Sequence, residues 1–294
     1  MGLRLKFNLV ILFTYMIGIC SVGYFGNQIL LTNTKQEVLQ NARILMDSAL
    51  AIRDYTVNEI RPLINKAKHT TFIPQTVPAY AAHANFKRLR VKHKDYSYKE
   101  ATINPTNPES RAADWEREII DHFRENKDAK EFFGTHIAST TNLPFLYLSK
   151  PIKITNPKCL ACHSTPKIAP QTLIDKYGNN NGFGWKLNSI VGAQIISVPM
   201  ALAQARADVA FKSFMIMITI VFFVIWILMN LLLHFIIIKP VRHISDTANK
   251  ISTGSIEHAK DIDITGNDEI ASLAHSFNRM QRSLTNAVRM LDQG

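Results

Sequence analysis

Two long apolar runs without charge constrain the fold more than any other feature of this sequence. No Asp, Glu, Lys or Arg occurs from Phe7 to Leu31 or from Ser213 to Ile238, which are runs of 25 and 26 residues. A helix of about 20 apolar residues spans the hydrocarbon core of a bilayer. The sequence therefore predicts two transmembrane helices, at residues 7–31 and 211–238, and excludes a soluble cytosolic enzyme. Residues 32–208 between them are long enough to form one folded domain.

Basic residues beside the outer ends of the two runs predict their orientation. Arg4 and Lys6 precede the first run, and Lys239 and Arg242 follow the second. Lys and Arg close to a span favour the cytoplasmic side of the membrane. This predicts a two-pass protein of a bacterial inner membrane, with residues 1–6 and everything after the second span in the cytoplasm. The domain between the spans is then periplasmic or otherwise extracytoplasmic.

The first run could instead be a cleaved signal peptide. It is long for that role, and Ser21-Val22-Gly23-Tyr24 is a poor match to the small-residue cleavage sites of such peptides. An uncleaved anchor is therefore the favoured interpretation.

The chain is basic, with 34 Lys and Arg against 23 Asp and Glu, and this charge bears on its partners. Most of the excess lies in residues 32–208, which contain 24 basic and 16 acidic residues. A basic domain can indicate nucleic-acid binding. The longest basic stretch, Lys87–Lys94, has apolar residues interleaved at helical spacing, which favours a solvated helix face near anionic lipid headgroups. No nucleic-acid partner is expected.

Two of the three cysteines belong to a single motif. Cys20 lies inside the first apolar run and is expected to act there as a small apolar residue. The other two stand in Cys159-Leu160-Ala161-Cys162-His163, and Cys-x-x-Cys-His is the attachment signature of c-type haem. Two thiols on one helical turn can form thioethers with one porphyrin, and the histidine that follows can bind its iron. We therefore predict one covalent haem c, attached at Cys159 and Cys162, with His163 as the proximal ligand.

The motif allows three other interpretations. A structural zinc site needs four ligands, and no second Cys or His pair at zinc-finger spacing occurs. A thioredoxin-like redox motif needs a βαβ pattern, whereas Pro157 and Pro166 here bracket a loop. A structural disulfide between Cys159 and Cys162 is also open. The haem interpretation is favoured because the predicted orientation places the motif outside the membrane, where c-type haem is attached.

The hydrophobic pattern of the intervening domain predicts a mixture of helices and strands. A helix from Thr32 to about Lys68 continues the first span outward, with a break between Pro62 and Pro78. The remaining expected elements are helices at 80–89 and 112–125 and strands at 132–138, 145–154 and 189–198. An α+β domain with a final strand leading into the second span is typical of a PAS-like sensor.

Several separated segments extend this likeness. They are Thr76–Ala82, Tyr98–Ala101, Asn104–Pro108, the Cys-Leu-Ala-Cys-His segment with Ala169-Pro170, Gly182–Trp185 and Gly192-Ala193. With these segments the chain resembles, from about Val38 to Pro199, the bacterial c-type haem sensor domains with a PAS-like fold. The resemblance implies one covalent haem and a role in sensing a ligand or a redox state.

The sixth ligand of the haem iron is not specified by the sequence. His69 and His83 are the distal candidates, because they flank the family-like Pro78-Ala79-Tyr80 stretch. The resembled family includes a cysteine as ligand, but residues 32–208 contain no cysteine outside the haem motif, so that ligation does not carry over. A five-coordinate iron, or one with a weak sixth ligand that opens for a diatomic gas, is also open.

The region after the second span has a heptad pattern. Val241, Ile244, Ala248 and Ile251 recur at steps of three and four, and Ile270, Leu273, Phe277, Met280, Leu284, Ala287 and Leu291 do the same. Two short heptad helices joined by a connector with Gly254, Ile262 and Ile264 predict a parallel four-helix coiled coil in a homodimer. Residues 239–291, with Pro240 and Asp268-Glu269-Ile270, closely resemble a HAMP signalling domain; the alternative is an ordinary coiled-coil tail.

These features combine into one functional prediction and two alternatives. We expect an extracytoplasmic α+β PAS-like domain between two transmembrane helices, followed by a helical HAMP coiled coil, in a dimeric receptor. The alternatives are a membrane-anchored cytochrome that carries electrons and a haem-free small-molecule receptor with a disulfide. No glycine-rich nucleotide loop or Ser/His/Asp arrangement occurs, so no enzymatic activity is expected. No kinase, cyclase or methyl-accepting segment follows before Gly294, so we expect either a separate cytoplasmic output protein or the loss of an output portion.

Overall fold

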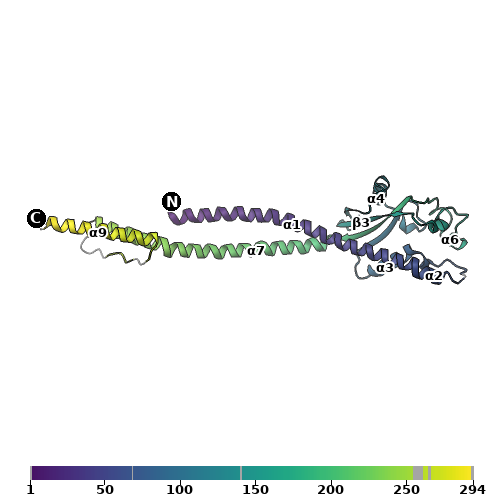
Figure 1. The fold of residues 1–294 in the computed structure, drawn as a ribbon, viewed down its shortest axis with the longest axis horizontal. Coiled ribbons are helices and arrows are strands. Elements are labelled where there is room, and N and C mark those ends of the chain that lie inside the picture. Colours follow the sequence, from purple (N-terminus) through teal and green to yellow (C-terminus); the bar gives the residue numbers. More distant parts are fainter. Residues whose placement is uncertain (1, 68, 140, 254–260, 264–265, 293–294) are drawn as a thin grey trace. The chain divides into compact units, whose positions relative to one another are not determined.

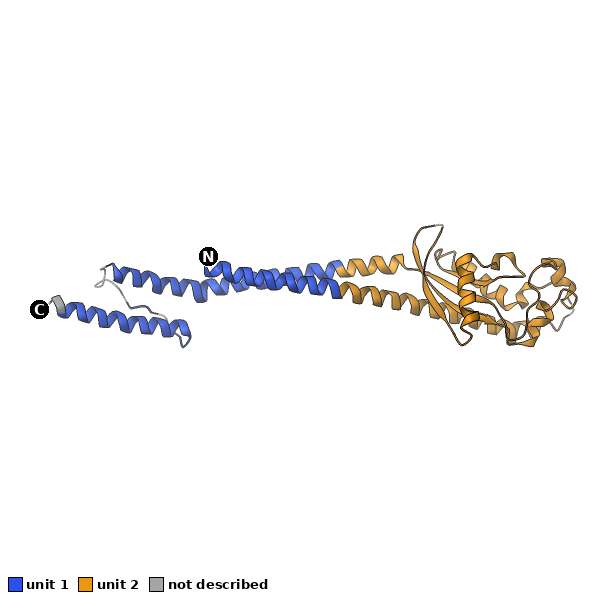
Figure 2. Ribbon diagram, turned by 90° about the horizontal axis from the view of Figure 1, so that it is seen from above, with its two compact units in different colours: residues 1–25, 212–294 blue, residues 26–211 orange. Residues whose placement is uncertain are grey.

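The computed structural model describes residues 2–67, 69–139, 141–253, 261–263 and 266–292 (Figure 1). The chain forms two compact units, coloured separately in Figure 2. Unit 1 contains residues 1–25 and 212–294, and unit 2 contains residues 26–211.

The helices are α1 (Leu3–Tyr55), α2 (Arg61–Ile64), α3 (Pro78–Leu89), α4 (Asp114–Glu125), α5 (Leu160–His163), α6 (Gln171–Tyr177), α7 (Ala201–Leu232), α8 (Lys239–Ser252) and α9 (Glu269–Asp292). The strands are β1 (Ser97–Thr102), β2 (Phe132–Ile137), β3 (Pro144–Lys153) and β4 (Ile190–Pro199). Short π-helical segments are Thr56–Ile60 and Leu233–Ile238, and 3-10 turns are Pro74–Thr76, Pro108–Ser110 and Pro157–Cys159.

Unit 2 is built on one antiparallel sheet with the strand order β1-β4-β3-β2. The pairing register of the strands shows which residues lie at each of the two ends of the sheet. Ser97 pairs with Ser197, Phe145 with Pro199 and Ile137 with Pro144, so these residues share one end, which we call the proximal end because α7 begins there at Ala201. At the other end, the distal end, Thr102 pairs with Gly192, Lys153 with Ile190 and Phe132 with Ser149.

Helices cover both faces of this sheet, and the side chains of each strand alternate between the two faces. Ile196 and Val198 of β4 pack in the cluster formed with α1 and α3, whereas Ala193 and Ile195 pack in the cluster formed with α4. The α1 side is filled by Val38, Leu39, Ala42, Met46 and Ala49, with Ala82 and Phe86 from α3. The α4 side is filled by Ile119, Ile120 and Phe123. The domain is therefore an α+β structure of three layers.

The three expected strands are confirmed to within one residue at each end, but β1 was missed. Its sequence, Ser-Tyr-Lys-Glu-Ala-Thr, lacks the apolar alternation of a buried strand because its charges are paired on both faces of the sheet. Glu100 forms an ion pair with Arg53 of α1 and accepts a hydrogen bond of 2.7 Å from the Tyr98 hydroxyl. Lys99 points to the opposite face, where its ammonium lies 2.6 Å from Glu116 of α4.

The first helix is continuous from the apolar run into the domain, as expected, and it ends within the stretch from Pro62 to Pro78 that was predicted to break it. The helix ends at Ile64, and Pro62 follows the π-helical segment Thr56–Ile60 by two residues. A proline lacks the amide for the i−4 bond and clashes with that carbonyl, and a π turn displaces the carbonyl. Pro240 follows the π-helical segment Leu233–Ile238 at the same spacing.

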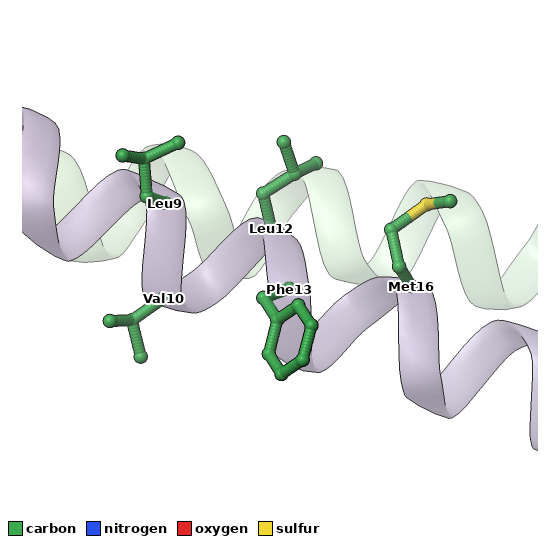
Figure 3. Close-up of a pocket in the computed structure, with 5 residues that line it drawn as sticks. All are labelled: Leu9, Val10, Leu12, Phe13 and Met16. Atoms are coloured by element: carbon green, nitrogen blue, oxygen red, sulfur yellow. The ribbon is translucent and has the colours of Figure 1, made fainter.

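Within unit 1, the apolar parts of α1 and α7 are paired by polar and aromatic contacts. The Asn8 side-chain oxygen accepts hydrogen bonds from the Trp226 indole at 3.1 Å and from the Asn230 amide at 2.9 Å. The Tyr15 ring stacks on Phe222 with centroids 3.9 Å apart. Both helices are long and apolar enough to cross a membrane. Exposed side chains such as Leu9, Leu12 and Phe13 line a shallow apolar hollow on α1 (Figure 3), as expected for a surface covered by lipid.

The C-terminal helices of unit 1 agree with the predicted heptad helices. Ile244 of α8 packs with Ala274 and Phe277 of α9 and with Ile262 of the connector. The Asn278 side chain bonds the Ile262 amide at 2.9 Å and its carbonyl at 3.0 Å, which holds the connector on α9. Asp268 caps α9 by accepting from the Ala271 amide at 2.8 Å. The predicted connector residues Gly254 and Ile264 lie outside the described residues.

The sheet establishes the α+β architecture, whereas the expectation of a PAS-like fold is finer than this topology and stays a prediction. The same holds for the predicted domain boundaries. The continuous helix Leu3–Tyr55 contains the whole of the first predicted span, and α7 with the following π-helical segment contains the second.

We expect Glu100→Gln to destabilise unit 2, because it leaves the Arg53 guanidinium partly buried without a counter-charge. The Arg53 side chain is 23% exposed and Glu100 8%. The cost should be about 2 kcal/mol, below the ~3–5 kcal/mol of a fully buried pair. The measurement is the midpoint of thermal unfolding of the full chain, followed by circular dichroism. Asp47→Asn is the control, because Asp47 pairs with Lys150 but is 69% exposed, and its cost should stay below about 1 kcal/mol. Equal losses in the two variants would contradict this account of β1.

Candidate functional site

The Cys-x-x-Cys-His motif lies just beyond the distal end of β3. The strand ends at Lys153, and the chain enters the 3-10 turn Pro157–Cys159 and then α5. The Asn156 side chain starts this turn by accepting a hydrogen bond of 2.9 Å from the Lys158 amide. Cys159 and Cys162 carry free thiols, and both are half-buried. The 3-10 turn and α5 therefore bring both sulfur atoms and the following histidine to one short helical segment.

The orientation of His163 is fixed by a loop far along the chain. Its Nδ1 lies 2.8 Å from the Gly182 carbonyl oxygen. Because a carbonyl can only accept, Nδ1 must carry the proton, and Nε2 of the neutral ring keeps its lone pair. The ring stacks on Trp185 with centroids 3.9 Å apart and planes 10° apart. Burial lowers the pKa of His163, which further favours the neutral ring that a metal ligand requires.

Two hydrogen bonds of the Asn104 side chain fix the loop that orients His163. The Asn104 side-chain oxygen accepts from the Gly182 amide at 3.1 Å, and its amide nitrogen donates to the Phe183 carbonyl at 3.2 Å. Two backbone bonds join the same loop to the motif, from the Gly184 amide to the Ser164 carbonyl at 2.9 Å and from the Trp185 amide to the His163 carbonyl at 3.1 Å. The loop and α5 therefore form one hydrogen-bonded unit around the imidazole.

Gly182 is required at its position for two independent reasons. Its φ of +86° lies in the left-handed region, and an added Cβ would stand 2.0 Å from the Thr106 Oγ1 atom. Only a glycine therefore lets the carbonyl reach His163 while the backbone passes this close to Thr106.

The stretch after α1 also lies close to the motif. Arg61 donates a hydrogen bond of 2.9 Å to the Thr76 carbonyl. Burial raises the pKa of the Cys162 thiol, and the positive charge of Arg61 offsets only part of this rise. This thiol is therefore protonated at neutral pH. Farther along the stretch, the Phe72 ring meets Tyr177 of α6 edge-on with centroids 5.8 Å apart.

The sequence matches two known protein families, which together cover most of the chain. Residues 31–199 match the Tll0287-like family, and residues 232–286 match the HAMP domain. The chain belongs to the Tll0287-like family. Among solved structures, the crystal structure of the cyanobacterial haem protein Tll0287 matches with 14% sequence identity and a TM-score of 0.43, over 55% of this chain and 95% of that one. No curated protein matches the chain.

The predicted distal candidates occupy different parts of the Tll0287-like domain. His69 is exposed, and its Nε2 lies 2.8 Å from the Ile64 carbonyl, in the stretch between Arg61 and Phe72. His83 is half-buried on α3, where its ring lies 5.3 Å from that of Tyr98. Among the described residues, neither contacts His163, and no three His, Cys, Asp or Glu side chains form a metal cluster.

The residues that orient His163 were missed as site residues in the sequence. Asn104, Thr106, Gly182 and Trp185 lie in segments that carried the family resemblance, but nothing in their spacing assigned them a role. The contacts join positions almost 80 residues apart in the chain, which only the fold brings together.

We expect Gly182→Ala to displace the carbonyl that orients His163, because the methyl group would overlap Thr106. Gly184→Ala is the matched control, since Gly184 has φ +80° in the same loop but no atom within 4 Å of an added Cβ. The control should lose only the roughly 1–2 kcal/mol cost of a left-handed conformation. The measurement is hydrogen exchange of the Trp185 amide together with the thermal midpoint. Faster exchange at Trp185 in the Gly182 variant alone is expected, and equal behaviour of the two variants would contradict the crowding at Thr106.

Proposed function

We propose that this protein is a dimeric receptor of a bacterial inner membrane that senses a redox state or a small ligand, such as a diatomic gas, through one covalent c-type haem. Cys159 and Cys162 would attach the haem, and His163 would bind its iron from the proximal side. The signal would pass through the HAMP domain to a separate cytoplasmic protein. The single observation that carries this proposal is the Nδ1 contact of His163 with Gly182, which leaves Nε2 free for a metal.

The two cysteines and the histidine of the motif fit a covalent c-type haem. The two thiols are half-buried and unbridged, so both are available for thioether bonds. The histidine is neutral, and both its tautomer and its ring plane are fixed, by Gly182 and Trp185 respectively. A haem iron in this position would supply a centre whose charge changes on reduction and which can bind a diatomic ligand. The hydrogen bond between Asn104 and the Gly182 amide keeps the imidazole in one orientation, and this orientation would constrain the ligand field of a bound iron.

Of the two distal candidates, we propose His69 rather than His83 as the sixth ligand. His69 lies in the stretch between Arg61, whose charge acts on Cys162, and Phe72, which contacts α6. His83 contacts Tyr98, which lies toward the proximal end of the sheet, away from the distal loops. Local hydrogen bonds do not separate the two candidates, because the His83 Nδ1 lies 2.8 Å from the Ala79 carbonyl and the His69 Nε2 lies 2.8 Å from the Ile64 carbonyl.

The covalent path from the motif to the cytoplasmic side supports a relay. Trp185, stacked on His163, stands five residues before β4, and β4 leads through Met200 directly into α7. A change in position of the imidazole would therefore act on the strand that continues into the second span. The family match at residues 232–286 places a HAMP domain after that span, and such domains point to membrane signal transduction.

The exposed heptad side chains of α9 support the homodimer. Leu273, Met280 and Leu284 are 49%, 61% and 45% exposed in the single chain. The face of α9 that packs within the chain carries Ala274, Phe277 and Asn278. A helix with a second apolar face buries it against another helix, and a coiled coil between two copies uses these positions.

The first test is an absorption spectrum of the full chain, made in cells with a c-haem maturation system, oxidised and reduced, with and without CO. We expect covalent haem, retained after denaturation, in the natural sequence and its loss in Cys159→Ser with Cys162→Ser. His163→Ala should keep the haem but change the spectrum. His69→Ala should also change it, whereas His83→Ala serves as the matched control.

The outcomes separate the alternatives. Absence of haem from the natural protein would overturn the proposal and leave the disulfide-linked, haem-free receptor. A spectrum that shifts with CO supports gas sensing. Reversible reduction with no response to CO, together with no change in α9 contacts between the two redox states, would indicate an electron carrier.

We expect Met280→Lys to weaken the dimer, because a charge would enter the predicted helix–helix core. Burial of a methionine contributes about 1.5–3 kcal/mol, so the dissociation constant should rise by at least about tenfold. Met290→Lys is the matched control, since Met290 is 76% exposed on the same helix and lies outside the heptad positions. The measurement is the dimer fraction against protein concentration in detergent, by sedimentation. If the Met290 variant dissociates equally, the heptad interface is wrong.

A further inference from the structure

Two loops lie at the proximal end of the sheet, beside the helices that lead to the apolar runs. The turn at 90–96 precedes β1, which begins at Ser97, and a second loop, described at residues 138–139 and 141–143, follows β2 and precedes β3. Both strand ends share an end of the sheet with Pro199, two residues before α7. Figure 2 shows that both long helices leave unit 2 from one end.

A cleft at this end shows how close the first turn lies to the ends of the predicted spans. Its volume is about 1210 Å³, and its walls include Leu30 of α1, Ala210 of α7, and Arg90, Lys92 and Lys94 of the turn. Leu30 is among the last residues of the first predicted span, and Ala210 immediately precedes the second. The basic turn therefore borders the same cleft as the helix residues next to the predicted membrane entry of both spans.

The turn combines unpaired positive charge with an exposed apolar side chain. Five basic residues between positions 87 and 94 are exposed, and within the described part of the chain none of them forms an ion pair; they are Lys87, Arg88, Arg90, Lys92 and Lys94. Val91, in the middle of this set, is 75% exposed. Acidic side chains on the cleft are Glu37, Asp95, Glu109 and Glu116. Of these, Glu116 is already paired with Lys99, and Asp95 is the one acid in the turn itself.

The hairpin turn between β2 and β3 adds apolar surface at the proximal end of the sheet. Ile137 and Leu143, which flank it, are 59% and 51% exposed. Leu143 also lines the cleft. Exposed apolar side chains next to a cluster of Lys and Arg are typical of surfaces that lie in the interface of an anionic membrane.

We propose that the proximal end of the domain binds anionic phospholipid headgroups, through the basic residues at 87–94, with Val91 and Leu143 at the headgroup boundary. The occupant is a lipid rather than a free anion because the cationic side chains lie beside the helix ends that enter the bilayer. The proposal rests on the predicted spans crossing a membrane but not on the haem or on signalling. A Lys or Arg at an anionic surface gains an attraction that corresponds to about a fivefold change in an equilibrium.

The test is hydrogen exchange of the full chain in nanodiscs of phosphatidylcholine alone and of phosphatidylcholine with phosphatidylglycerol. We expect amides in the turn at 90–96 to exchange at least about fivefold more slowly in the anionic discs. Lys92→Glu with Lys94→Glu should abolish this difference. Lys127→Glu with Lys130→Glu is the matched control, because it changes the net charge equally in the loop before β2, at the distal end, and should leave the difference intact.

Each other outcome overturns the proposal. Equal exchange in the two lipids would mean that the turn does not bind anionic headgroups. Slower exchange on adding inorganic phosphate to phosphatidylcholine discs would mean a free-anion site instead. Loss of the effect in the control variant would mean that net charge, not this turn, is responsible. None of these readouts depends on haem, so the absorption spectrum tests the proposed function separately.

Discussion

The hydrogen bond between His163 Nδ1 and the Gly182 carbonyl is the contact on which the rest of the site depends. It joins the end of α5 to a loop that leads directly into β4, and Asn104 and Trp185 reinforce it from two sides. β4 is hydrogen-bonded on both edges, to β3 along its whole length and to β1 from Gly192 to Ser197. A strand held on both sides moves with its sheet rather than alone. The proposed sensor site is therefore coupled to the most constrained element of the domain, which is also the element that continues into α7.

The path from this site to the membrane is long, because the motif lies at the distal end and α7 begins at the proximal end. β4 contains 10 residues, which at about 3.3 Å per residue corresponds to about 33 Å. Over that length, the sheet is joined to α1 by the ion pair of Arg53 with Glu100 and to α4 by that of Lys99 with Glu116. Ion pairs of low exposure fix the geometry more than they stabilise it, since desolvation offsets much of their attraction. Their role here is consistent with keeping the sheet and α1 in one register.

The sequence predicted the elements with apolar periodicity and missed those whose burial depends on charge. β2, β3 and β4 alternate or are rich in branched and aromatic residues, and their bounds were confirmed to within one residue. β1 was missed because Lys99 and Glu100 face opposite sides, each paired with a different helix. The Cys159, Cys162 and His163 motif was evident because its chemistry is local. Asn104 and Gly182 could not be assigned a role, because their contact with the motif exists only after loops separated by almost 80 residues meet.

The two π-helical segments share a cause. Each ends two residues before a proline, Pro62 in one case and Pro240 in the other, and in each the helix continues beyond that proline. An ordinary α-helix would have to kink or end there, because the proline ring meets the carbonyl four residues earlier. Widening the preceding turn removes that clash and keeps the helix continuous, but it leaves backbone bonds of poorer geometry. One such segment lies between α1 and the stretch beside the haem motif, and the other forms the last six residues of the second apolar run, directly before α8. The chain therefore places its two π-helical segments before the stretch beside the haem motif and before α8, in each case where a proline would otherwise kink or end the helix.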